Sequence, residues 1–210
     1  MSVSLRAALN STILPRVTDT IGGPAPAWLL RLNSQLDAAD QRATAVARGL
    51  TPLQLNWSRS PAEWSVGQCL EHLAIANEVY LQAMSRSLEG RRAGLVEEIA
   101  PGWFGRLFIR TVIEPSPKMR RWRAPKKIRP GNQVPPTVLD RFHATNRAIR
   151  EFVQRARNYD VNRIRFKNPF VRIIRFTVGT GLEVLWRHER RHLLQAERIR
   201  AALDATVRAP

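Results

Sequence analysis

The chain contains a single cysteine, Cys69, among 210 residues, so it cannot form an intrachain disulfide. One free thiol is typical of a reducing compartment, and we expect a cytoplasmic protein. The sequence has no apolar run of 18 residues and therefore predicts no transmembrane helix. Its first 25 residues lack the apolar region and the small-residue cleavage site of a secretory signal.

Acidic residues are also scarce, because 17 Asp and Glu accompany 34 Lys and Arg and leave a formal net charge of +17. The excess is concentrated in residues 106–129, where nine basic residues accompany one acidic residue, Glu114. This charge favours nucleic acid, anionic lipid or small anions as partners, although a solvated surface has the same composition. Trp103, Phe108 and Trp122 interleave with the cations, which suits nucleic acid or a membrane surface. The simpler interpretation is that these rings pin the segment to the rest of the protein.

Apolar residues recur at intervals of three and four in four long segments, which predicts four amphipathic helices. These segments are residues 26–49, 65–90, 136–158 and 177–203. With 44% hydrophobic residues the chain can bury one core, so we expect an all-α fold, a four-helix bundle over residues 26–206 preceded by a tail over 1–25.

The connections between the four predicted helices are unequal. Residues 90–135 form a long crossover between the second and third helices, with a short amphipathic helix expected at 102–113. The residues before the fourth helix, 163–174, have an extended pattern. At the start of the second helix, Ser65 and Gln68 have the spacing of a capping box.

The four histidines of the chain carry its chemistry: His72, His143, His188 and His192. His188 and His192 lie four residues apart in the fourth helix, so both can reach one metal ion. The intervening Glu189 completes the pattern H-E-x-x-H of zinc proteases, in which it would be the general base. Only 18 residues follow His192, and they contain no histidine that could be a third ligand. Ordinary buried histidines bonded to their neighbours are an alternative.

Two segments resemble the DinB-like (DinB/YfiT) superfamily of bacterial four-helix bundles. Residues 64–74 carry W-S-x-x-x-x-x-x-H-L, and residues 187–196 are similar to the motif of the last helix in that family. The resemblance covers roughly residues 26–206. It implies a triad of metal ligands, His72, His188 and His192, that binds nickel or zinc. Some relatives are thiol-dependent S-transferases or isomerases that use a low-molecular-weight thiol.

We therefore expect a metal-dependent enzyme acting on a small molecule, with thiol transfer as the first choice and hydrolysis as the second. Glu189 could be a general base or orient an imidazole, and Arg191, beside Arg187 and Arg190, could bind an anionic thiol cofactor. Cys69 could be a fourth ligand or a reactive thiol, but a buried apolar filler is the simpler interpretation. His143 is expected at the surface, and a homodimer is compatible with the sequence. The alternatives are a basic module that binds nucleic acid or an anionic surface without catalysis, and an H-E-x-x-H metalloprotease.

Overall fold

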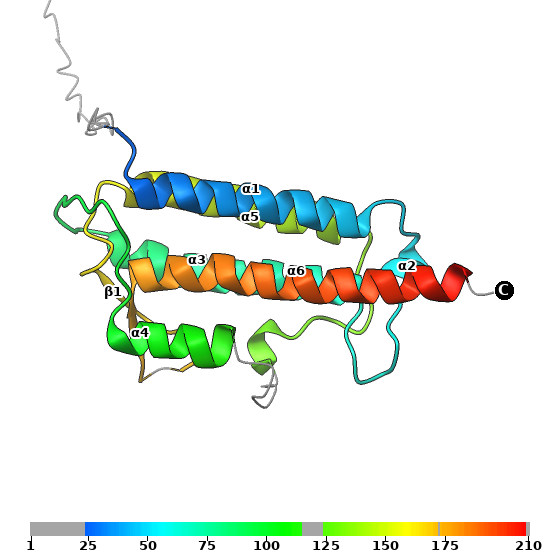
Figure 1. Cartoon of the computed structure of the whole chain (residues 1–210). Coiled ribbons are helices and arrows are strands. Elements are labelled where there is room, and N and C mark those ends of the chain that lie inside the picture. Colours follow the sequence, from blue (N-terminus) through cyan, green and yellow to red (C-terminus); the bar gives the residue numbers. More distant parts are fainter. Residues whose placement is uncertain (1–23, 115–123, 172, 209–210) are drawn as a thin grey trace, which may run out of the picture.

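The computed structural model describes residues 24–114, 124–171 and 173–208. Four long helices form a bundle, as the periodicity predicted (Figure 1). They are α1 (Ala27–Ala47), α3 (Val66–Leu88), α5 (Val138–Ala156) and α6 (Val178–Arg208). Within the described residues, no helix is both long and apolar enough to cross a membrane.

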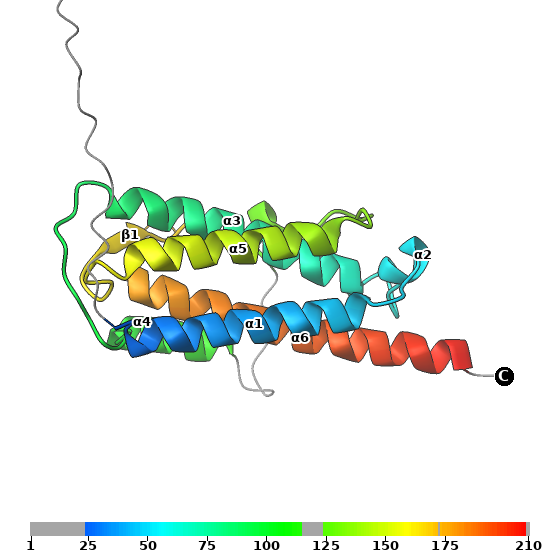
Figure 2. The same cartoon turned by 90° about the horizontal axis from the view of Figure 1, so that it is seen from above.

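The direction of the helices explains the long crossover. Helices α1 and α6 run one way and α3 and α5 the other (Figures 1 and 2). Two ion pairs, Arg31–Glu183 and Arg42–Glu197, agree with the parallel course of α1 and α6. On α3, His72 faces His188 and Met84 lies next to Gly181, so α3 and α6 are antiparallel. Because α3 and α5 are consecutive long helices and run parallel, the chain between them must return along the whole length of the bundle.

The crossover contains three short helical segments. Helix α4 (Trp103–Phe108) continues into the π-helix η1 (Ile109–Ile113), where a single short helix was predicted, and η2 (Lys126–Ile128) follows. Of the basic stretch 106–129, the structure describes five cations, and all are exposed: Arg106, Arg110, Lys126, Lys127 and Arg129. Trp122 and the other four cations of that stretch lie outside the described residues, as do residues 1–23 of the tail predicted over 1–25.

Capping boxes fix two helix starts. The hydroxyl of Ser65 accepts a hydrogen bond from the Gln68 amide at 3.1 Å, and the Gln68 side chain accepts one from the Ser65 amide at 3.0 Å, as predicted. Thr51 and Gln54 form the same motif at the start of α2 (Pro52–Leu55), a short helix that the periodicity did not indicate. Because α3 begins at a fixed residue, His72 lies in its second turn.

The segment before α6 is extended, as expected, and forms a two-stranded antiparallel hairpin. Strand β1 (Arg165–Lys167) pairs with β2 (Arg175–Thr177) so that Phe166 lies opposite Phe176. Both rings are buried against the bundle, and the residues on either side of each ring are more exposed.

A polar layer divides the core into two apolar clusters. One cluster surrounds Trp28, Phe152 and Leu182, and the other surrounds Phe142 and Leu193. On α3, α5 and α6 the clusters are separated by four buried polar residues: Asn77, Thr145, Asn146 and Glu189. Since burying unpaired polar groups is costly, this layer must be held by its own hydrogen bonds.

Candidate metal centre

Three of the four histidines converge between α3 and α6. One ligand nitrogen of each of His72, His188 and His192 lies within 4.8 Å of the others. Nε2 of His72 and Nε2 of His188 lie 3.1 Å apart. Two nitrogens bound tetrahedrally to one zinc ion would lie about 3.3 Å apart. The spacing therefore fits a shared ion.

Hydrogen bonds orient two of the imidazoles. Nδ1 of His72 lies 2.6 Å from the carbonyl oxygen of Ile128, which can only accept, so this nitrogen carries the proton. Nδ1 of His192 donates in the same way to Oε1 of Gln195 at 3.0 Å. Nε2 of both rings then keeps a free lone pair. In known metal sites, hydrogen-bond partners beyond the ligand shell orient imidazoles in the same way. Nε2 of His188 either donates a hydrogen bond to the lone pair of His72 or shares an ion with it.

The cluster disfavours protonated imidazole. Burial lowers the pKa of His72 to about 4, and the positive charge of Arg191 acts in the same direction. Burial also lowers the pKa of His188 and His192, with further lowering from the neighbouring histidines and Arg191. All three rings are therefore neutral at pH 7, which is the form that binds metal.

Access to the cluster is uneven. His72 and His192 are buried, whereas His188 is half-buried. The ring of Trp64 covers the other two imidazoles, with centroid distances of 4.7 Å to His72 and 5.6 Å to His192. The sequence showed Trp64 only at the start of the motif over residues 64–74, and its position as a wall of the site was missed. His188 is thus the most exposed residue of the three.

Comparison with family models identifies the chain. The model described as DinB superfamily matches residues 35–196, most of the bundle and all three histidines. The chain belongs to the DinB superfamily. Neither the comparison with curated proteins nor that with solved structures gave a match. Membership confirms the resemblance stated from the two motifs, and it agrees with the helical bundle.

In this DinB-superfamily chain, Glu189 lies in the polar layer. It is fully buried, and its Oε1 accepts a hydrogen bond of 2.7 Å from Nδ2 of Asn77. The same amide nitrogen lies 3.2 Å from Oγ1 of Thr145 and 3.3 Å from Oδ1 of Asn146. Burial raises the pKa of Glu189 to about 8, although the Asn77 hydrogen bond opposes this shift. The carboxyl group is therefore mostly protonated at pH 7, and it is not a member of the histidine cluster.

The arginines of α6 hold the crossover against the bundle. Arg187 and Arg190 both form ion pairs with Glu114, which follows η1. Nη1 of Arg191 donates to the carbonyl oxygens of Val112 at 2.7 Å and Ile113 at 3.2 Å. Arg191 thus has a structural contact, and its positive charge lowers the pKa of the three histidines. Whether it also binds a cofactor stays a prediction.

The remaining candidates lie outside the cluster. Cys69 is fully buried, and burial raises the pKa of its thiol, which disfavours the thiolate and agrees with an apolar filler. His143 is half-buried on α5, with Nε2 3.3 Å from Oγ1 of Thr44. It therefore offers a natural control for the other three histidines.

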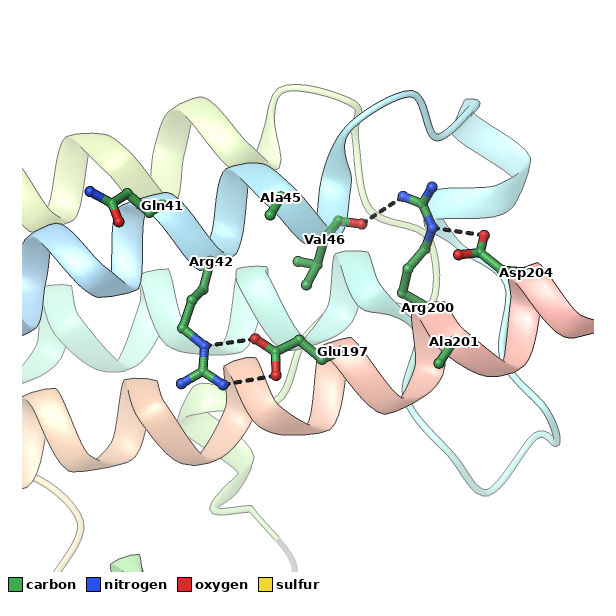
Figure 3. Close-up of a pocket in the computed structure, with 8 residues that line it drawn as sticks. All are labelled: Gln41, Arg42, Ala45, Val46, Glu197, Arg200, Ala201 and Asp204. Carbon is green, nitrogen blue, oxygen red and sulfur yellow. Dashed lines mark hydrogen bonds and ion pairs between the residues drawn. The ribbon is translucent and has the colours of Figure 1, made fainter.

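A shallow groove between α1 and α6 lies apart from the histidines (Figure 3). A two-armed ion pair crosses it, with Arg42 donating to Glu197 at 2.6 and 2.8 Å. Farther along, Arg200 donates to Asp204 and to the carbonyl oxygen of Val46. Because these cations and acids bond to one another, they hold the two helices together and leave few free polar groups for a ligand.

Proposed function

We propose that this protein is a metal-dependent enzyme whose single divalent ion is bound by His72, His188 and His192. The observation that carries the proposal is the convergence of three neutral imidazoles, with ligand nitrogens within 4.8 Å of one another. Nickel and zinc both favour imidazole donors, and three protein ligands leave an open position of the catalytic type. When bound, such an ion lowers the pKa of a thiol or of water.

The side chains of the site supply orientation and access. The Ile128 carbonyl and Gln195 hold the protons on Nδ1, so that His72 and His192 keep Nε2 free. Trp64 shields one side of the cluster, and a substrate would approach past His188. The charge of Arg191 would attract the carboxylates of a low-molecular-weight thiol. These features favour thiol transfer to a small electrophile over hydrolysis.

General base catalysis by Glu189 is a minor part of the proposal. Oε1 of Glu189 accepts a hydrogen bond from Asn77, and the carboxyl group is mostly protonated near pH 7. A structural role in the polar layer is better supported than proton abstraction. The same contacts weigh against metalloprotease chemistry, which would need this carboxylate as the base next to the ion.

The metal content of the purified chain tests the site. After reconstitution with Ni²⁺ or Zn²⁺ and removal of free ion, we expect close to one ion per chain for the parent and for His143→Ala. The double variant His188→Ala/His192→Ala should retain less than ~0.2 ion per chain, because one imidazole rarely holds an ion alone. Undiminished metal in the double variant, or a similarly low content in the parent, would contradict the proposed site.

The reaction class is tested with the metal-loaded protein, a low-molecular-weight thiol and an aryl chloride as the electrophile. Thiol transfer predicts a rate that requires the thiol and the metal, that persists in His143→Ala and that is lost in the double variant. Metal-dependent cleavage of an activated ester without thiol would instead assign hydrolysis.

A further inference from the structure

Exposed apolar side chains are concentrated on α4 and at the tip of the β-hairpin. Trp103 is 72% exposed, and Phe104 and Leu107 on the same helix are also exposed. At the hairpin tip, Ile173 is 92% exposed, and Val171 is exposed beside it. These short segments contain half of the large exposed apolar residues found in the described part of the chain. Phe108 of α4, in contrast, is half-buried and packs against the core.

The same two segments carry positive charge without compensating acids. Four exposed cations lie on them, Arg106, Arg165, Lys167 and Arg175, and a fifth, Arg110, lies on η1, which continues α4. Neither residues 102–113 nor residues 165–177 contain an Asp or Glu. Among the described residues none of the five cations has an ion-pair partner, in contrast to Arg187 and Arg190 on α6.

The strand register places two of these cations face to face. Lys167 of β1 lies opposite Arg175 of β2, on the outward face of the hairpin. Like charges directly opposite each other destabilise a strand pair. The buried pair Phe166 and Phe176 on the inner face holds the hairpin together despite this repulsion. An anionic partner on the outer face would relieve it.

Helix α4 and the hairpin are adjacent. The ring of Phe176 lies 6.1 Å from that of Phe104 and 4.9 Å from that of Phe108. Both segments lie on the side of the bundle opposite α1 and α5 (Figure 1). The apolar side chains and the cations can therefore act on one partner.

We propose that α4 and the hairpin form a membrane-contact surface that attaches the protein peripherally to anionic lipid bilayers. Apolar side chains such as Trp103 and Ile173 would enter the headgroup region, while the cations would contact lipid phosphates. Single-stranded nucleic acid is the less suitable partner, since it is bound by aromatic platforms, whereas Leu107, Val171 and Ile173 cannot stack on bases.

Sedimentation of the full chain with lipid vesicles tests this surface. At ~0.1 M salt, a concentration that screens distant charges, we expect binding to phosphatidylcholine vesicles containing phosphatidylglycerol and little binding to phosphatidylcholine alone. Arg165→Gln/Lys167→Gln/Arg175→Gln should weaken binding about 10- to 100-fold, because each cation near an anionic surface contributes several-fold. Trp103→Ser/Ile173→Ser should weaken it at least about 10-fold.

Matched variants separate this surface from general charge and general apolar exposure. Arg147→Gln/Arg155→Gln/Arg198→Gln removes the same charge from exposed positions on α5 and α6. Leu53→Ser/Val207→Ser removes two exposed apolar side chains from α2 and the end of α6. Both controls should change binding less than about 3-fold. Circular dichroism should show that all variants keep the helical fold.

Three outcomes would overturn the proposal. The first is no binding of the parent to anionic vesicles. The second is equal weakening by the two triple variants, which would indicate net charge alone. The third is binding to a DNA or RNA oligonucleotide that depends on the hairpin cations while vesicles are not bound, which would assign the surface to nucleic acid.

Discussion

Glu189 lies between two candidate ligands in the sequence, yet its side chain joins the buried amide of Asn77. Such a carboxyl group is stable in the folded protein as the neutral acid, because burial raises its pKa from 4.5 to about 8. The unfolded chain releases this proton at lower pH than the folded one. Glu189 should therefore destabilise the fold as pH rises between these two values.

We predict that Glu189→Gln flattens the pH dependence of the unfolding free energy between pH 6.5 and 8. One proton held by the folded state gives a slope of about −1.4 kcal/mol per pH unit, and the neutral amide has none. The buried histidines act with the opposite sign, since their lowered pKa values raise stability with pH only below their ordinary value of 6.5. Urea unfolding of the metal-free protein at several pH values measures the slope.

Glu197→Gln is the control for this prediction, because Glu197 lies on the same helix but pairs with Arg42 at the surface. It should keep the slope of the parent. A parent with no decrease in stability from pH 6.5 to 8, or a Glu189→Gln variant with the same decrease, would show that Glu189 is ionised in the fold.

At the residue scale, the spacing of His188 and His192 predicted that they share a face, and the upstream motif predicted His72 as their partner. The sequence could not give the orientation of the rings, because the partner of His72 is a backbone carbonyl of residue 128, far away in the chain. Asn77 was missed although a signal existed. It interrupts the apolar stripe of α3 between Leu73 and Tyr80, where a buried amide must find partners.

Among the shorter elements, α4 depends on a close approach to α6. A Cβ atom at Gly105 would lie 2.8 Å from Cγ2 and 2.9 Å from Oγ1 of Thr180, whose β-branched side chain is stiff. We predict that Gly105→Ala destabilises the docking of α4 by about 1–3 kcal/mol. The measurement is hydrogen exchange over residues 103–113, which should become faster.

Gly102, the N-cap residue of the same helix, provides the comparison, because nothing lies within 4 Å of a Cβ atom placed there. Gly102→Ala should change the exchange rates little. Equal effects of the two substitutions would mean that the contact between α4 and α6 does not restrict Gly105.

Element boundaries followed from the sequence where a local rule determines them. The capping box of Ser65 and Gln68 fixed the start of α3, and apolar periodicity gave the other long helices to within a few residues of their ends, except that α6 continues to Arg208. The π-helical turn at Ile109–Ile113 could not be foreseen, because over five residues its apolar pattern does not differ from that of an α-helix. The hairpin was expected only as extended chain, since its pairing depends on burying Phe166 and Phe176 together.

For the whole molecule, the proposed ion would connect helices that are distant in sequence. His72 and His188 are 116 residues apart. An ion that binds only the folded chain stabilises it by about 2.7 kcal/mol at a concentration of about 100 times Kd. We predict that Zn²⁺ or Ni²⁺ at this level raises Tm by about 5–10 °C in the parent and in His143→Ala.

The double variant His188→Ala/His192→Ala should show no such increase, measured by scanning calorimetry at equal ion concentration. A Tm increase of the same size in that variant would mean that the ion binds elsewhere on the folded chain.

The hydrogen bond from His72 to the Ile128 carbonyl would link the affinity of the proposed site for its ion to the position of the crossover. Ile128 belongs to η2, in the same connection that carries α4. Any partner that shifts this connection changes the fraction of chains in which Nε2 of His72 is available. By reciprocity, the ion must then change the affinity for that partner by the same factor. A long return loop, required by two parallel helices, would in this way give the site a means of allosteric control.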